Sequence, residues 1–428
     1  MNSWIFIVIF LVLMFAKVPI AFSLGLASAY YFINHGVPIE TLVQIMLSIF
    51  HSFPMLAIPF FMLAASIMNT GGITKRLFET AKLLVIHIPG GLGQVNIIAS
   101  LIFAGISGSA TADAAGLGIV EIEAMLKEKY DPAFSAAVTA ASSVVGPIFP
   151  PSLGFVLYGS ITGTSVGALF IAGVIPAIIM VAGMMLVVYI IAKKKKFKVY
   201  KRAKLKEILI SFKSSLLPML TPIIILGGIL GGIVTPTEAA VIAIMYSIFL
   251  GAVVYKELNV NNFITTIIET GKTASKLMLI VSMAGVFGWI LAYEGIPAKL
   301  ATLLFSISDH RNIILLLAVL LILFLGCFME GISILLIVVP ILLPVLKNAG
   351  IDLVHFGVVQ SIANNIGLIT PPLGIAGYIV ADIAKVSFEK VVSVLVPFII
   401  ILIVALFIIA YFPRISLWLP TILMGYGT

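Results

Sequence analysis

The stretch Gly146-Pro147-Ile148-Phe149-Pro150-Pro151-Ser152 interrupts an apolar segment, and Gly367-Leu368-Ile369-Thr370-Pro371-Pro372 interrupts another in the second half of the chain. Proline removes a backbone donor and clashes with the preceding turn, so consecutive prolines stop a helix. Inside a bilayer the freed carbonyl groups need partners, and irregular backbone is tolerated there only where it is buried in protein or lines a cavity. We therefore expect two broken helices whose breaks lie inside the protein.

The two interruptions fall in register when the chain is shifted by 221 residues, which places Gly146 on Gly367 and Pro150-Pro151 on Pro371-Pro372. The same shift also places Asp131 on Asp352. Chance matches of glycine, paired proline and aspartate at the irregular segments are improbable. The sequence therefore predicts two homologous halves, residues 1–190 and 208–428, joined by a linker at 191–207.

Each half contains a second irregular region before its proline break. Residues 92–130 and 313–347 each consist of an apolar arm, a glycine-rich polar centre and a second apolar arm, which is typical of a re-entrant helical hairpin. A broken helix follows each hairpin, over residues 132–160 and 352–384. The predicted fold class is an all-α polytopic membrane protein with two inverted structural repeats, each with one hairpin and one proline-broken helix.

The composition agrees with this fold class. Of the 428 residues, 61% are hydrophobic and only 10% are charged, whereas a soluble protein carries about 25% charged residues. A cytosolic enzyme, a nucleic-acid binder and a secreted disulfide scaffold are thereby excluded, and Cys327 is the single cysteine. The N-terminus is interpreted as a first membrane helix, with a break at Lys17-Val18-Pro19, rather than as a cleaved signal.

The net charge of +8 comes from one stretch. Nine of the 25 basic residues lie between Lys193 and Lys206, and the remainder of the chain is close to neutral. By the positive-inside rule this loop marks the cytoplasmic side. A binding site for nucleic acid or acidic lipid is the alternative interpretation.

The hairpin centres carry the polar groups, in Gly105–Asp113 and Gly326–Ser333. A broken helix offers amides to an anion at one end and carbonyl groups to a cation at the other. These oxygen ligands suit an alkali cation. Asp113 and Glu330 are costly in hydrocarbon and indicate function, although either could be a snorkelling residue at a helix end. Asn364-Asn365 would be expensive facing lipid and are placed inside.

Simpler interpretations stand beside these. Small residues in membrane helices usually indicate close packing, which is an alternative for Ser107–Thr111. Asp131 and Asp352 each precede an apolar helix and are interpreted as N-cap or first-turn acids. Gly105-Ile106-Ser107-Gly108 also fits an intramembrane serine protease. That chemistry needs a histidine base, and all five histidines fall at predicted span ends or in loops.

Together these motifs resemble the large membrane subunit of tripartite ATP-independent periplasmic (TRAP) transporters. The resemblance is carried by Ser107-Gly108-Ser109-Ala110-Thr111-Ala112-Asp113, the two proline breaks, and Pro236-Thr237-Glu238-Ala239-Ala240. It covers essentially the whole chain. The sialic-acid and C4-dicarboxylate branches share these motifs, so the transported acid stays open.

The resemblance implies a secondary transporter rather than an enzyme, with sodium as the coupling ion and no resident cofactor. It implies an elevator mechanism, in which a transport domain of hairpins and broken helices slides against a scaffold. The expected partners are a small four-helix membrane subunit, a periplasmic substrate-binding protein, an organic anion and the lipid bilayer, with no nucleic acid. The expected location is the bacterial inner membrane.

The resemblance also implies site residues. One sodium site would use Gly105, Ser107, Gly146 and Pro150, and a second would use Glu330, Gly331, Gly367 and Thr370. The substrate group comprises Ser109, Thr111, Asp113, Ser333, Asn364 and Asn365, in which Asp113 would support the first hairpin. A stand-alone divalent-anion/sodium symporter, an ion channel and the intramembrane protease are the alternative functions.

Overall fold

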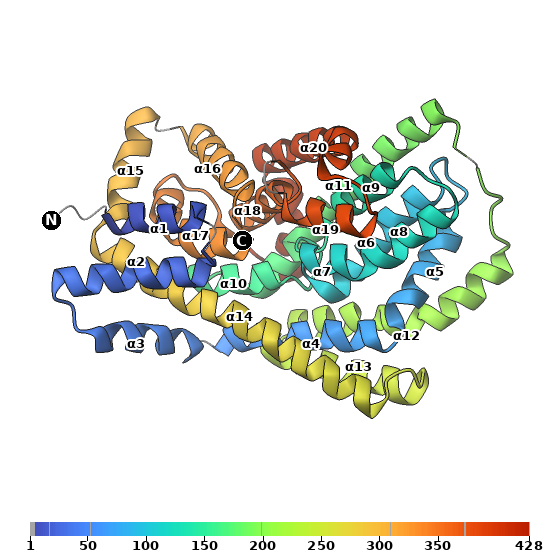
Figure 1. Ribbon diagram of the computed structural model, residues 1–428, viewed down its shortest axis with the longest axis horizontal. Helices are drawn as coiled ribbons and strands as arrows, with labels where there is room; N and C mark the ends of the chain where they lie inside the picture. The colour runs from blue at the N-terminus through green and yellow to red at the C-terminus, as the bar shows by residue number, and fades with distance from the viewer. Residues whose placement is uncertain are drawn as a thin grey trace.

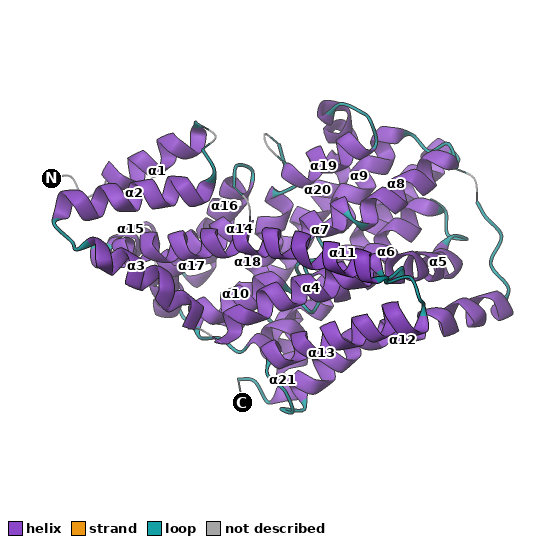
Figure 2. Cartoon of the chain, turned by 60° about the horizontal axis from the view of Figure 1, so that its bottom comes forward, coloured by secondary structure: helices purple, strands orange, loops and turns teal. Residues whose placement is uncertain are grey.

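The computed structural model describes residues 5–16, 18–51, 53–197, 199–308, 310–329, 331–371 and 374–427. Over these ranges every regular element is a helix, and turns and loops connect the helices (Figures 1 and 2). The all-α prediction is confirmed. Helix α1 (Ile5–Phe15) ends just before the predicted break, and α2 (Ile20–His35) begins directly after Pro19.

Several helices are long and apolar enough to cross a bilayer, which needs about 20 residues. Within the described ranges these are α11 (Val166–Lys195), α13 with its π-helical extension η3 (Pro236–Val254), α14 (Val260–Tyr293), α17 (Gly331–Asn348) and α20 (Phe388–Tyr411). Helices α4 (Ala57–Thr70) and α5 (Ile73–Val85) together form a sixth candidate, bent by 71°. The chain is a multi-pass membrane protein.

One group of helices forms the lower layer of Figure 1. Here α13 packs along α4, α12 (Leu205–Leu230) packs along α5, and α14 crosses both α2 and α4. Many side chains in this layer are apolar and exposed, as in α3 (Ile39–Ser48), where no described residue is buried. Four further elements lie outside the predicted hairpins and broken helices, namely η1 (Ile49–His51), η2 (Phe53–Leu56), α15 (Ile296–Ile307) and α21 (Arg414–Met424).

The first predicted hairpin consists of α6 (Leu92–Ser107), the short α7 (Ala110–Ala115) and α8 (Leu117–Lys127), and α6 packs against α8. The broken helix follows as α9 (Pro132–Ser143) and α10 (Leu153–Thr162), with an irregular segment between them.

The caps of these helices follow from single residues. Asp131 Oδ1 accepts a hydrogen bond from the Phe134 amide at 2.8 Å and so caps α9, and Asp352 does the same for His355 at the start of α18. The N-cap interpretation of both aspartates is confirmed.

The second predicted hairpin and broken helix correspond to α16 (Arg311–Gly326), α17, α18 (Leu353–Gly367) and α19 (Ile375–Ile383), and the repeat itself stays a prediction. Its hairpin tip includes Glu330 and its break includes Pro372, which both lie outside the described residues. The two halves interlock, because α9 packs on α19 and α20, and α10 packs on α17. This interlocking brings the two breaks into one region.

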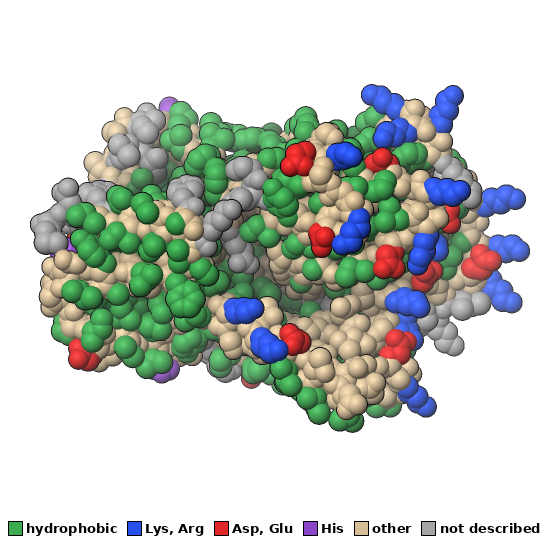
Figure 3. All heavy atoms as spheres, in the orientation of Figure 1, with side chains coloured by type: hydrophobic (Ala, Val, Ile, Leu, Met, Phe, Trp, Pro, Cys, Tyr) green, Lys and Arg blue, Asp and Glu red, His purple; other side chains and the backbone are tan. Residues whose placement is uncertain are grey.

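Basic side chains gather at one end of the molecule, the right side of Figure 3. Helix α11 runs to Lys195 and α12 begins at Leu205, so the non-helical part of the linker is shorter than residues 191–207. Lys193–Lys196 are exposed there. Much of the remaining surface in this view is apolar, as lipid contact requires.

Candidate functional site

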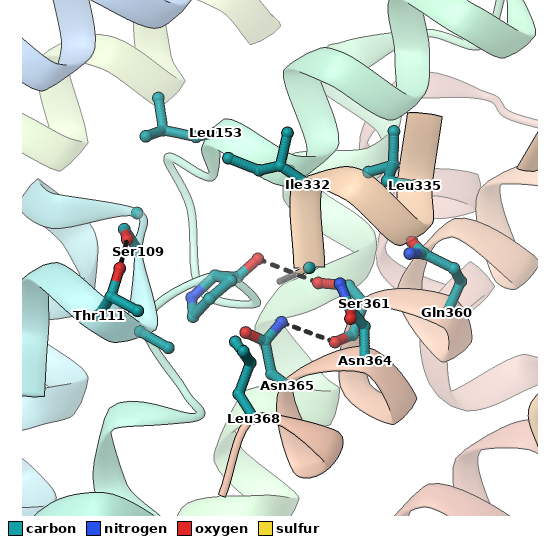
Figure 4. Close-up of a pocket in the computed structure, with 15 residues that line it drawn as sticks. Ser109, Thr111, Leu153, Ile332, Leu335, Gln360, Ser361, Asn364, Asn365 and Leu368 are labelled. Atoms are coloured by element: carbon teal, nitrogen blue, oxygen red, sulfur yellow. Dashed lines mark hydrogen bonds between the residues drawn. The ribbon is translucent and has the colours of Figure 1, made fainter. Parts of the chain in front are cut away.

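A cavity lies where the two hairpin tips meet the two breaks (Figure 4). Four segments that are distant in sequence line it. These are the first tip (Gly108, Ser109, Ala110, Thr111), the first break and the start of α10 (Pro147, Leu153, Gly154), the start of α17 (Gly331, Ile332, Leu335), and the end of α18 (Gln360, Ser361, Asn364, Asn365, Leu368). All four are at or beside segments that the sequence marks as irregular.

Glycine lets the first tip approach the first break. Gly108 has φ +58°, and a Cβ there would lie 2.7 Å from the Pro151 carbonyl oxygen. The chain then enters α7 through its N-cap Ser109, whose Oγ lies 3.1 Å from Thr111 Oγ1. A Cβ at Gly146 would lie 3.2 Å from the Ser109 carbonyl oxygen. The tip hydroxyls and the carbonyl groups of the break are therefore held together.

The first break is also tied to the second half. Ser361 Oγ on α18 donates to the Pro147 carbonyl at 3.3 Å, and Ser152 Oγ donates to the same carbonyl from within the break. Asn365 Nδ2 donates to the Ser361 carbonyl at 2.7 Å (Figure 4). The carbonyl freed by the break thus has partners, as irregular backbone in a membrane requires.

The second hairpin meets the second break by direct backbone contact. A Cβ at Gly367 would lie 2.5 Å from the Gly326 Cα, and a Cβ at Gly331 would lie 2.4 Å from Asn364 Nδ2. Thr370 Oγ1 donates to the Ile366 carbonyl at 2.7 Å. Of the predicted second sodium site, Gly331 lines the cavity and Gly367 lies against the second hairpin at Gly326.

Several polar atoms around the cavity are buried without a hydrogen-bond partner in the described structure. They are Ser107 Oγ, Ser333 Oγ, Asn364 Oδ1 and Gln360 Nε2. Buried polar groups are otherwise nearly always hydrogen-bonded. Both donors and acceptors are left over, so this set suits a bound cation together with a polar solute.

No lysine, arginine or histidine is among the residues that line the cavity in the described part of the chain. A negatively charged solute would therefore meet only neutral donors here, namely the amide groups of Gln360, Asn364 and Asn365 and the hydroxyls of Ser109, Thr111 and Ser361. Neutral hydrogen bonds orient an anion but leave its charge uncompensated.

Sequence reasoning placed some residues correctly beside the cavity and not others. Ser109, Thr111, Gly331, Asn364 and Asn365 line it, and the remaining predicted residues with described positions do not. Ser333 is fully buried behind it. Asp113 is also buried and faces away, because it follows Thr111 by two residues, or about 200° around a helix. The grouping of Asp113 with the substrate residues stays a prediction, and the position of its side chain does not support it.

Sequence reasoning missed Gln360 and Ser361. They lie four residues before Asn364 and Asn365 on one helix, and residues four apart share a helix face. That spacing could have indicated that Gln360 and Ser361 lie on the same helix face as the two asparagines. The structure does not support the protease interpretation. Ser107 Oγ has no hydrogen-bond partner among the described residues, and the His355 ring is hydrogen-bonded to Ser416 and to the Ala410 carbonyl instead.

A cavity that lies between hairpins and broken helices in a helical membrane protein is typical of a secondary transporter. The family model described as "Tripartite ATP-independent periplasmic transporter, DctM component" matches residues 7–415. The chain belongs to this family and is a transporter permease subunit, not an enzyme, as the sequence predicts.

Curated relatives and solved structures agree with that assignment. The chain is 44% identical to the sialic acid TRAP transporter large permease protein SiaM of Vibrio cholerae, over 97% of both chains. It is 37% identical to the C4-dicarboxylate TRAP transporter large permease protein DctM of Pseudomonas aeruginosa, over 86% of both. The crystal structure of the Alcanivorax borkumensis YdaH transporter shares the fold, with a TM-score of 0.64 at 15% identity over 99% of this chain and 98% of that one.

Proposed function

We propose that this protein is the large permease subunit of a tripartite transporter that takes up an organic acid anion of the sialic-acid type, driven by sodium. The observation that carries the proposal is the neutral cavity between the two tips and the two breaks. It offers amides and hydroxyls to a solute, and backbone carbonyl groups lie beside it for cations.

The lining favours a hydroxyl-rich acid with one carboxylate over a C4-dicarboxylate. The described lining offers a second carboxylate no basic side chain, only neutral amide and hydroxyl donors. Hydroxyl and amide groups of a sugar acid would instead pair with Gln360, Asn364 and Ser109. The relative with 44% identity is a sialic acid permease, which supports the same choice.

Two sodium sites flank the solute in this proposal. The first uses the unpartnered Ser107 hydroxyl with Gly105, Gly146 and Pro150, and the second uses Gly331, Gly367 and Thr370 with Glu330. Oxygen donors of this kind suit an alkali cation. Sodium ions on both sides of an anion compensate its charge where the side chains do not.

We propose that transport occurs by an elevator movement, which compensation of the solute charge makes less costly. The hairpins and broken helices carry solute and ions together, and the lower layer of α4, α12, α13 and α14 remains as the scaffold. Sodium ions that move together with the anion lower the cost of carrying its charge through a low-dielectric zone.

The proposed partners are a small membrane subunit and a periplasmic binding protein, in a bacterial inner membrane. Family membership supports this assembly. The uncovered apolar side chains of α3 give the small subunit or lipid a surface to contact.

Uptake into proteoliposomes tests the proposal. The permease is reconstituted with its small subunit and binding protein, and labelled sialic acid uptake is measured with and without an inward sodium gradient. We expect uptake only with sodium, and Ser107→Ala should weaken it. Ser393→Ala is the matched control, because this exposed hydroxyl bonds only to a carbonyl of its own helix. Full uptake without sodium would refute the coupling, and uptake without the binding protein would favour a stand-alone symporter.

A further inference from the structure

Two carboxyl groups are buried inside the first hairpin, away from the cavity. Asp113 on α7 and Glu121 on α8 are each 1% exposed. None of their four carboxyl oxygens has a hydrogen-bond partner in the described structure. The two helices that carry these groups pack against each other. Neither residue lines the proposed solute and sodium sites.

The surroundings of this pair are polar but uncharged. Ser100 faces Asp113, and its hydroxyl donates to Ser142 at 3.0 Å. Asn96 donates to Thr139 at 2.7 Å and accepts from Ser142 at 2.7 Å. A Cβ at Gly118 on α8 would lie 2.9 Å from Thr139 Cγ2, so this network borders the junction of α7 and α8. The side chains of this network therefore form these hydrogen bonds with one another.

No cation neutralises the pair among the described residues. The elements packed on α7 and α8 include α6, α9 and α19. Helices α6 and α9 carry no charged residue. On α8, Glu123 and Lys127 pair with each other at the surface, and the exposed Asp382 at the end of α19 pairs with Lys385. Tyr378 of α19 is 49% exposed and stacks on Phe388.

Two ionised carboxylates would be unstable in this buried, uncharged environment. Each would be buried without a partner, and each would repel the other. The inexpensive state holds a proton on each carboxyl group, because an ionised group without a partner is costly to bury. A proton needs no further ligands, whereas a metal ion would need several oxygens that the network already uses.

The pair is linked to the cavity through a single short helix. Asp113 lies on α7, which also carries the cavity residue Thr111 and is capped by Ser109. A movement of the tip around a solute therefore moves one member of the pair relative to Glu121 on α8. We propose that Asp113 and Glu121 form a proton-binding site, and that proton occupancy changes when the tip closes on a solute. The solute-dependent part rests on the proposed function.

Infrared spectroscopy of the permease in lipid tests this directly, since a protonated carboxyl group has a carbonyl stretch that a carboxylate lacks. We expect this band to disappear as the pH is raised and to change when sialic acid is added. Both signals should be absent in the Asp113→Asn/Glu121→Gln double variant. Glu123→Gln, on the exposed side of the same helix, should retain both.

The single variants keep the test decisive if the double variant does not fold. Asp113→Asn or Glu121→Gln leaves one acid without a like-charged neighbour, so its band should be lost at a lower pH than in the unaltered chain. A band that survives in the double variant, or that responds to neither pH nor solute, overturns the proposal. If no solute binds, the proposed function fails while the pH titration still decides the proton site.

Discussion

The contact between Gly326 and Gly367 gives a sharp test of how the second hairpin is held. A Cβ at Gly367 would lie 2.5 Å from the Gly326 Cα and 2.6 Å from its carbonyl carbon. Carbon atoms in contact normally lie about 3.5–4.0 Å apart. Gly367→Ala therefore requires the two backbones to separate by roughly 1 Å, and no flexible side chain is available to absorb that shift.

Overpacking of this kind costs about 1–3 kcal/mol, and a clash between two backbones belongs at the upper end of that range. We expect Gly367→Ala to lower the free energy of unfolding by about 3 kcal/mol and to weaken sodium-dependent uptake, because Gly367 belongs to the proposed second sodium site. Thermal unfolding in detergent and the proteoliposome assay measure the two effects.

Gly271→Ala is the matched control. Gly271 is exposed in the interior of α14, and a Cβ there would meet nothing within 4 Å. Alanine is the better helix former by about 1 kcal/mol, so this variant should be neutral or slightly more stable. The packing argument is refuted if Gly367→Ala unfolds at the same temperature as the unaltered chain and transports at the same rate.

Three further predictions concern the solute, the caps and the orientation in the membrane. Gln360→Glu places a negative charge beside an anion, and calorimetry should show solute binding weakened at least about tenfold, with Gln360→Ala less affected. Asp131→Ala should lower the free energy of unfolding by about 1 kcal/mol, because the helix cap is lost. Asp352→Ala should lower it by more, since Asp352 Oδ2 also accepts a hydrogen bond from Tyr426 at 3.1 Å. Chemical denaturation measures both effects. A cysteine placed in the basic linker should react with a membrane-impermeant thiol reagent only from the cytoplasmic side, and labelling from outside would contradict that orientation.

The helix breaks and caps could be predicted from the sequence because their causes are local. Proline pairs stop a helix wherever they occur, and an aspartate before an apolar run caps the helix that follows. The structure accordingly ends α9 and α18 before the two breaks and caps them with Asp131 and Asp352. The hairpins follow from the same kind of reasoning, since a glycine-rich centre separates two apolar arms.

The direction of individual side chains could not be predicted in the same way. Asp113 lies two residues from Thr111, yet one side chain lines the cavity and the other is buried behind it. The difference depends on where α7 starts and on how it is rotated against α9, which is a matter of tertiary packing. The burial of Glu121 could not be predicted either, because a glutamate close to Glu123 and Lys127 in the sequence is typical of an exposed helix.

The charge distribution connects these sites in the proposed mechanism. Because the described cavity lining lacks a basic side chain, an anion bound alone would leave a negative charge buried in the membrane. In the proposed mechanism, sodium ions at the two breaks compensate that charge, so a transport domain that holds the anion alone moves less readily than one that holds the anion with sodium. A basic residue in the cavity would bind the anion without sodium and would abolish that dependence. In this proposal the neutral lining makes transport of the anion depend on sodium, and protons on Asp113 and Glu121 leave the moving hairpin uncharged there.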